Sequence, residues 1–314
     1  GSVEWNDIPL LLEDLERIEV IRGPNAAAFG ANAFMGVINI ITRDAATSST
    51  AAKLALGDNG QRNLMGRYSG HGGAWNYRLS AGYRADNGID NVYDDQAQKI
   101  IDLRADYRPN SRDTWAIGAG YNNSRRDRGS LTSVFDQPHP DNIDNAYGQL
   151  RWSRVLGADR EISAQIYHNS YKLDGRTTTL PIAQLGNQQF NIGGELDLGR
   201  TDVEAQFRFS PTPDWRWVAG AGIRRDSALS EFYLGTPKRE INDTSRLFAH
   251  AEWSATSRLN LNLGAMLEDT SYSGGEFSPR LALNYRLTPD HALRLSSSRA
   301  YRTPTIFEEK ANNY

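Results

Sequence analysis

Four acidic side chains lie close together in one polar stretch of the sequence: Asp86, Asp90, Asp94 and Asp95. Clustered carboxylates, together with backbone carbonyls, are ligands that calcium prefers. The spacing does not match the loop of an EF-hand, and a solvated surface loop is the better explanation of the same composition. The stretch is therefore a weak candidate for a metal site.

Positive charges and aromatic rings form a second candidate site. Arg125 and Arg126 stand at the end of one alternating segment, and polar stretches carry Phe135, Phe232 and Tyr233. Arginine forms strong, charge-assisted hydrogen bonds with anionic oxygens, and aromatic rings complement cations. Together these residues would suit an anionic metal chelate. The alternative is that they are ordinary loop residues.

Patterns that indicate catalysis are missing from the sequence. It contains no Gly-x-Ser-x-Gly elbow and no His-Glu-x-x-His pattern. It also has no cysteine, which excludes disulfides, thiolate metal sites and a cysteine nucleophile. The five histidines are scattered, and His139, between two prolines, is the one with access. We therefore expect no enzyme activity and no cofactor.

Composition excludes some partners. The 314 residues carry a net charge of -3, so no strongly basic surface predicts nucleic-acid binding. Mean hydropathy is -0.60, and no run approaches the roughly 20 apolar residues of a membrane-spanning helix. A membrane β-barrel escapes this test, because alternate side chains face lipid and a wet lumen. The first residues lack the features of a signal peptide.

A compact apolar unit opens the chain. We expect a short helical turn over residues 7–16 and a strand over 17–21 that ends at Gly23-Pro24. A small-residue loop follows, and then a nearly all-apolar strand over 37–41 that is buried on both faces. Residues 45–50 read as a linker.

From Ala51 onward, polar and apolar residues alternate with the period of a β-strand. The segments run to roughly ten residues or more, the length that a tilted strand needs to cross a bilayer. The apolar phase changes between Leu198 and Val203, and Gly199 between them predicts a β-bulge. Twelve strands are expected, with a thirteenth near 292–298, in a sheet that is incomplete.

Short turns alternate with longer polar loops. Short turns are expected at 71–73, 109–111, 157–158, 211–213, 255–257 and 288–290, and long loops at 86–97, 126–143, 172–189 and 228–243. Tryptophans next to the short turns predict an aromatic girdle at one interface: Trp75, Trp115, Trp152, Trp215 and Trp253. A soluble propeller also spaces tryptophan regularly, but its strands are nearer ~5–6 residues. The pattern predicts an all-β, transmembrane antiparallel barrel with periplasmic turns.

Several stretches resemble a known family. Ile18–Pro24, Phe29–Ala33 and Gly36–Thr42 resemble the end of the plug domain of TonB-dependent outer-membrane receptors, and Ser298–Glu308 resembles a segment past mid-barrel in them. The resemblance implies a barrel of about 22 strands around a small α/β plug. Residues 1–48 would be the C-terminal part of the plug and 49–314 the N-terminal part of the barrel. The first part of the plug, the TonB box and the last strands are expected to be absent here.

The resemblance also assigns a gating role to Arg22, Gly23 and Pro24. In the family this arginine tends to join a charge cluster between plug and barrel. Strand phase predicts three partners that face the lumen, with Glu252 taken for the gate: Glu204, Glu252 and Glu268. Such a network would hold the plug and break when the plug moves. A solvated surface arginine is the alternative.

The expected function is energised uptake of a scarce nutrient, most often a ferric siderophore, across the bacterial outer membrane. The expected partners are the TonB complex, the metal chelate and membrane lipid, with no nucleic acid. Cobalamin receptors of the family bind calcium with acidic loops. Haem receptors use a loop histidine near a Phe-Arg-Ala-Pro motif, which Tyr301–Pro304 only approximates. A passive porin is the other alternative, although a porin has no plug-like unit before its first strand.

Overall fold

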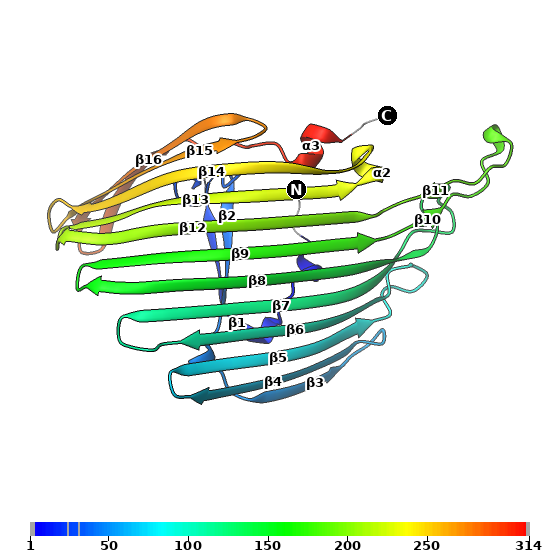
Figure 1. Ribbon diagram of the computed structural model, residues 1–314, viewed down its shortest axis with the longest axis horizontal. Helices are drawn as coiled ribbons and strands as arrows, with labels where there is room; N and C mark the ends of the chain where they lie inside the picture. The colour runs from blue at the N-terminus through cyan, green and yellow to red at the C-terminus, as the bar shows by residue number, and fades with distance from the viewer. Residues whose placement is uncertain (1–3, 24, 31, 312–314) are drawn as a thin grey trace.

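A 13-stranded antiparallel sheet makes up most of the structure, a computed structural model that describes residues 4–23, 25–30 and 32–311 (Figure 1). Its strands are β3 (Ala51–Leu56), β4 (Arg62–Gly72), β5 (Trp75–Asp86), β6 (Gln96–Tyr107), β7 (Asp113–Arg128), β8 (His139–Gly157), β9 (Arg160–Asp174), β12 (Leu196–Thr212), β13 (Trp215–Ser230), β14 (Thr236–Ser254), β15 (Leu259–Thr270), β16 (Gly274–Thr288) and β17 (His291–Ser298). They lie side by side in chain order, with β3 and β17 at the two edges. The predicted partial barrel is confirmed.

The connections differ at the two ends of the sheet. All six predicted short turns are found, and the other end carries the small elements β10 (Thr177–Thr178), η4 (Ala183–Leu185), β11 (Asn191–Ile192) and α2 (Glu231–Leu234). Two long loops were predicted too long. Strands β7 and β8 pair as far as Arg128 and His139, and β13 and β14 as far as Ser230 and Thr236. The loops were predicted to begin where the side chains become polar. The backbone hydrogen bonds between these strands continue past that point, so the strands are longer than the apolar segments.

The convex face carries an apolar band across neighbouring strands. Leu79 lies opposite Leu103, and Val203 lies between Ile166 and Ile223; all are partly or largely exposed. Exposed apolar side chains in register are what a lipid-facing surface requires. The concave face is polar, as the alternation predicts.

Aromatic rings pair at the short-turn end. Ring centroids are 4.4 Å apart for Trp75 and Tyr107, and 5.1 Å apart for Trp215 and Trp253. Each pair joins residues that lie opposite one another on adjacent strands. The tryptophans therefore lie at one level of the sheet, as a girdle requires.

The predicted bulge at Gly199 is wrong. Gly199 pairs in register with Ser170 on β9 and Ser227 on β13, without a shift. Leu198 faces the concave side and packs against an apolar cluster of Ala228 on β13, Leu234 on α2 and Ile306 on the last helix, α3 (Ile306–Lys310). The apolar phase changes because the concave face meets that cluster, whereas Val203 belongs to the convex band.

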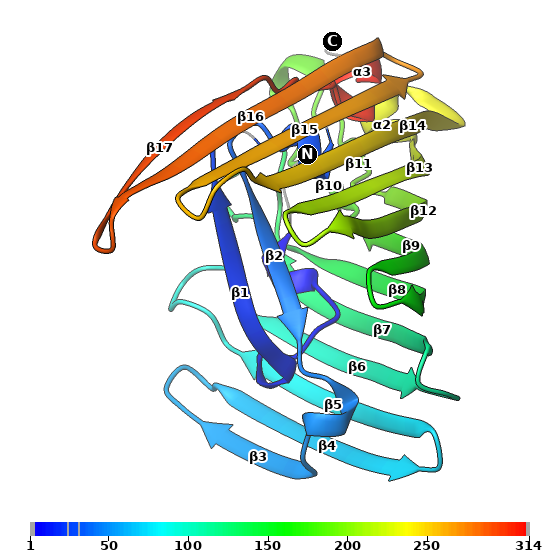
Figure 2. The same cartoon turned by 90° about the vertical axis from the view of Figure 1, so that its left-hand side faces the viewer.

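The N-terminal segment (residues 4–48) crosses the concave face of the sheet (Figure 2). It contains η1 (Trp5–Asp7), η2 (Leu12–Asp14), β1 (Leu15–Arg22), α1 (Ala26–Phe29), β2 (Gly36–Thr42) and η3 (Ala45–Thr47). Strands β1 and β2 form a separate two-stranded sheet. Burial of β2 on both faces was predicted wrongly: Ile38 is 50% exposed, since two strands alone leave apolar surface uncovered. No helix in the described ranges has the length and apolar character to cross a membrane.

Candidate functional site

A cavity of about 1010 Å³ lies between the N-terminal segment and the sheet. Its lining is rich in charged side chains. Seven arginines and three carboxylates belong to it: Arg78, Arg104, Arg126, Arg128, Arg151, Arg200 and Arg224 with Glu4, Asp141 and Asp226. Among the described residues, all of these arginines except Arg151 form ion pairs with carboxylates of the lining or just behind it. Three tyrosines lie among them: Tyr147, Tyr167 and Tyr171. Such a lining complements an anionic ligand with aromatic groups.

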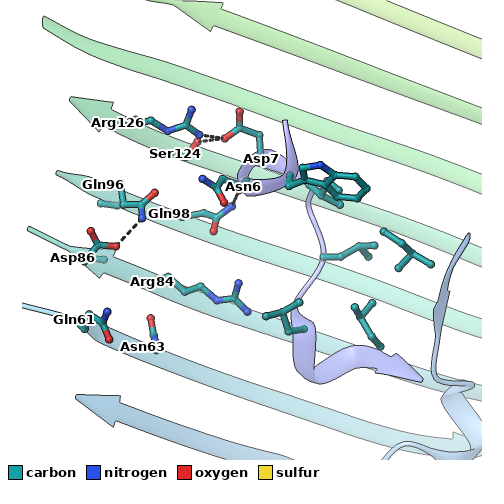
Figure 3. Close-up of a pocket in the computed structure, with 18 of the residues that line it drawn as sticks. Asn6, Asp7, Gln61, Asn63, Arg84, Asp86, Gln96, Gln98, Ser124 and Arg126 are labelled. Atoms are coloured by element: carbon teal, nitrogen blue, oxygen red, sulfur yellow. Dashed lines mark hydrogen bonds and ion pairs between the residues drawn. The ribbon is translucent and has the colours of Figure 1, made fainter. Parts of the chain in front are cut away.

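A second pocket, of about 610 Å³, lies beside η1 and η2 (Figure 3). The N-terminal segment supplies an apolar side that includes Ile18, Val20 and Ile38. Strands β4 to β7 supply a polar side that includes Arg84 and Gln98. The two sides differ because β1 and β2 present apolar residues to a concave face that alternation has made polar.

One acidic residue of the N-terminal segment is enclosed by the sheet. Arg126 donates to the Asp7 carboxylate over 2.8 Å, a contact visible in Figure 3. The Tyr171 hydroxyl donates to the same carboxylate over 3.2 Å. Asn122 and Asn145 donate to the Asp7 backbone carbonyl over 3.1 and 2.8 Å. Asp7 is 1% exposed. These donors come from β7, β8 and β9, and we call this arrangement the Asp7 socket.

The Asp7 socket makes the contact depend on pH. Burial raises the pKa of Asp7 above its ordinary value of 3.8, outweighing the opposing effects of Arg126 and of the hydrogen bonds from Tyr171 and Ser124. The enclosed carboxylate therefore takes up a proton more readily than the free one. By linkage, the contact strengthens as pH falls through the raised pKa and stops changing below 3.8.

We expect Asp7→Asn to remove this pH dependence. The measurement is the urea concentration at which the full-length protein, carrying Ala26→Cys as its only cysteine, becomes accessible to 2,2′-dipyridyl disulfide, a reagent that also reacts with thiols in acid, between pH 3.5 and 7 (approximate limits of the window). The control, Asp90→Asn in the exposed acidic loop, should keep the dependence. Equal pH profiles for Asp7→Asn and Asp90→Asn would contradict the assignment.

A second acidic residue of the segment lies in a buried charge cluster. Arg67 donates to Asp14 over 2.9 Å, and Arg78 Nε lies 3.7 Å from the same carboxylate oxygen. Arg78 also donates to Asp102 over 2.7 Å, and the Tyr147 hydroxyl donates to Asp102 over 2.6 Å. The side chains of Arg78, Asp14 and Asp102 are at most 1% exposed. A charge that loses its partner at such a site has little water to replace it.

The short-turn end of the segment is held by further polar contacts. Arg104 donates to Asp44 over 2.6 Å and to Thr42 over 3.1 Å. The backbone amide of Ala45 donates to Asp106 over 3.1 Å. The N-terminal segment is thus fixed to strands β4 to β9 by charged and polar groups along its length.

The segment meets strands β14 to β16 differently. Helix α1 packs against β15, where a Cβ added at Gly264 would lie 3.6 Å from the Cβ of Ala27. Gly30 has φ +85°, and a Cβ there would lie 2.8 Å from Glu268 Oε2. Small residues bring the two backbones together on this side, and Arg280 adds one hydrogen bond to Asn25.

The predicted gate residues do not come together. Arg22 is exposed and has no ion-pair partner within the described part of the chain. Glu204 pairs with Arg246, and Glu252 lies near Arg216. Glu268 faces Gly30. Gly23 adopts φ +85°, and Pro24 lies outside the described residues. The charged contacts between segment and sheet belong instead to the Asp7 socket and the Asp14 cluster.

The predicted ligand residues have separate surroundings. Arg126 holds Asp7, whereas Arg125 pairs with Asp127 at the surface. The His139 ring lies between Asp136 and Asp141, at 3.6 and 3.5 Å. Three ring-bearing residues are exposed at the loop end: Phe135, Phe232 and Tyr233. Of these, Tyr233 meets Phe307 edge to face.

The acidic loop is tied to its own backbone. Asp86 accepts from Gln96 and from the amide of Gly88, and Asp94 accepts from the amide of Ile89. In ranges 4–23, 25–30 and 32–311, no three acidic, histidine or cysteine residues converge as a metal site would need. The four aspartates therefore do not form a shared site in this structure.

A curved antiparallel sheet with a lipid-type convex face, an aromatic girdle and an occupied concave face defines an outer-membrane β-barrel protein. The description "TonB dependent receptor-like, beta-barrel" matches residues 43–313. The chain belongs to this family, whose members lie in the bacterial outer membrane.

Known relatives span the whole chain. It is 23% identical over 346 residues to the vitamin B12 transporter BtuB of Vibrio cholerae, covering 100% of this chain and 51% of BtuB. It is 24% identical to the iron-regulated outer membrane virulence protein of the same species, covering 95% and 46%. The ferric enterobactin receptor of Pseudomonas aeruginosa superposes with a TM-score of 0.75 at 14% identity, covering 97% and 50%. The chain spans about half the length of these relatives, and the structural likeness shows the fold alone.

Proposed function

We propose that the chain is part of a gated importer whose N-terminal segment is the back half of the plug. The observation that carries this proposal is the pair of buried contacts through which the sheet holds Asp7 and Asp14. A passive pore does not require an internal segment that buried ion pairs hold against its wall. Force from the TonB complex would release the segment, and no catalysis is required.

The ligand that the cavity supports best is an anionic metal chelate of the ferric siderophore class. Guanidinium groups and three tyrosine rings surround about 1010 Å³, and they can donate to anionic oxygens and stack on aromatic rings of a ligand. Six of the seven arginines also pair with carboxylates, so the support comes from Arg151 and from the outer donors of those ion pairs. The relatives described as iron-regulated and ferric enterobactin receptors are in line with this class. A cobalamin is the second candidate, because BtuB matches the chain along its full length.

The gate is tested by removing residues 4–48 from the full-length receptor. Ferric enterobactin, haem and cyanocobalamin serve as probes in cells that lack their own receptors, with and without TonB. The intact receptor should support growth on one probe only when TonB is present. The deletion should remove the TonB requirement and admit small antibiotics, because the part of the plug that the sheet holds through Asp7 and Asp14 is then gone.

Uptake that still needs TonB after the deletion would overturn the gate. Growth on cyanocobalamin alone would move the ligand to the cobalamin class and leave the gate intact. Outer-membrane fractionation and heat-modifiable migration on gels check that the shortened protein inserts.

A further inference from the structure

Asn32, in the loop between α1 and β2, is bonded to the chain that follows β17. Its side-chain amide donates to Thr303 Oγ1 over 2.8 Å, and its Oδ1 accepts from the Thr303 amide over 3.1 Å. The Asn32 amide also donates to the Tyr301 carbonyl over 2.9 Å. Two of these three hydrogen bonds join residues 271 positions apart, and the third goes to Tyr301, two residues earlier. We call this contact the Asn32–Thr303 clasp.

The local conformation favours asparagine at this position. Asn32 has φ +76°, a left-handed conformation that asparagine tolerates better than most residues. In that conformation the backbone amide and the side chain of Asn32 both point to the same segment, which contains Tyr301 and Thr303. Thr303 is 4% exposed, so its hydroxyl has little access to water in place of Asn32. Thr303 therefore depends on the clasp, whereas Asn32 is exposed and supplies it from the surface.

The segment beyond the clasp reaches the loop end of the molecule. Thr305 caps α3 through a reciprocal pair of hydrogen bonds with Glu308, and Ile306 packs against Ala228 and Leu234. Phe307 meets Tyr233 edge to face. Figure 1 shows α3 beside α2 at that end of the sheet.

The clasp lies on the lining of the cavity. Asn32 and residues Thr303 to Phe307 all belong to the lining of the volume of about 1010 Å³. A ligand in this space would touch α3 on one side and the loop of the N-terminal segment on the other. Any change in the position of either partner acts on the same three hydrogen bonds.

We propose that the Asn32–Thr303 clasp couples residues 299–311 to the N-terminal segment, with Asn32 and Thr303 as its positioning residues. The inference deepens the proposed function, and the importance of the clasp for uptake rests on that function. When the segment is held, α3 is tied to it over the cavity; when the segment moves, the clasp breaks and α3 keeps only its packing against β13 and α2. Coupling is reciprocal, so a ligand that fixes α3 also stabilises the loop around Asn32.

Hydrogen–deuterium exchange of the purified full-length receptor, without ligand, tests the coupling. Asn32→Gly keeps the left-handed backbone and removes both side-chain bonds, and Thr303→Val keeps the shape and removes the hydroxyl. We expect Asn32→Gly to raise exchange in residues 301–311 by about threefold to tenfold, the size of one to two net hydrogen bonds. Thr303→Val should raise exchange in residues 25–36 by a similar factor. Thr303→Ser, which keeps the hydroxyl, should behave like the native protein.

The decisive result is the effect across the clasp. If each variant raises exchange only in its own segment, or if Thr303→Ser is as disturbed as Thr303→Val, the coupling is absent. The readout needs neither TonB nor ligand. If exchange is coupled across the clasp but uptake does not need TonB, the clasp stands and the proposed gate is rejected. If uptake needs TonB but exchange is not coupled, the gate stands and the clasp is rejected.

Discussion

Replacing Arg78 by methionine should release the N-terminal segment at a much lower urea concentration. Arg78 is the guanidinium that stands between Asp14 on the segment and Asp102 on β6, and all three side chains are buried. Its removal leaves Asp14 with Arg67 alone and Asp102 with the Tyr147 hydroxyl alone, and both carboxylates are buried. Breaking a buried pair in this way costs about 3–5 kcal/mol. The Ala26→Cys reporter measures it as the urea midpoint of maleimide labelling in the full-length receptor.

Arg17→Met is the matched control for Arg78→Met. Arg17 pairs with Glu16 and Glu19, but its side chain is 51% exposed and solvent screens these pairs, so its loss should leave the urea midpoint close to that of the native protein. If Arg78→Met does not insert, Tyr147→Phe offers a milder change that removes only the hydrogen bond to Asp102. Arg17→Met sets the urea midpoint for comparison. If Arg78→Met and Tyr147→Phe both have that same midpoint, the cluster does not hold the segment.

A disulfide between Ala27 and Gly264 should stop energised uptake. Their Cβ positions would lie 3.6 Å apart, within the range of roughly 3.5–4.5 Å that disulfides adopt. The chain has no cysteine, so no other pairing competes within it. The bond would fix α1 of the segment to β15 of the sheet. If the segment must move, the oxidised receptor should lose at least about 90% of its TonB-dependent uptake, as expected when opening needs a broken covalent bond.

Room for the new side chain requires one further substitution. A Cβ at Gly264 would lie 2.6 Å from the His250 Nδ1, so the cysteine pair is built in a His250→Ala background. The background alone, each single cysteine, and the reduced pair should all retain uptake. Undiminished uptake by the oxidised pair, with the bond verified by mass spectrometry, would show that this contact stays closed during transport.

The sheet could be predicted from the sequence because alternation is a local property. Strands such as β5, with Leu79 outward and Arg78 inward, show the period within a few residues, and the turns between them are short. Gly199 misled the prediction because a phase change has two causes. A bulge is one of them, and a change in what the concave face contacts is the other, which only the packing of α3 on Leu198 reveals.

The candidate site depended on a placement that no local pattern encodes. Arg126 was singled out for its charge, but its partner Asp7 is 119 residues earlier and lies in a single helical turn without periodicity. Arg78 and Asp102 follow the inward phase like many other polar residues, and nothing marks them as buried. Arg22 was chosen by resemblance, yet its direction depends on how β1 and β2 lie against the sheet. Only that orientation decides which charges meet.

The two sides of the N-terminal segment also differ in the chain length that each contact must close. Asp14 and Arg67 are 53 residues apart in the sequence, and Asp7 and Arg126 are 119 residues apart. Asn25 and Asn32 bond to residues that are 255 and 271 positions further along the chain. Closing a loop about five times longer than the 53-residue loop costs roughly 1.4 kcal/mol more in chain entropy. A chain that adds its strands in order can therefore bind the segment to β4–β7 while β15 and β16 are still unfolded. In chain entropy alone, the contacts of the segment with β4–β7 are therefore easier to close than its contacts with β15, β16 and Thr303.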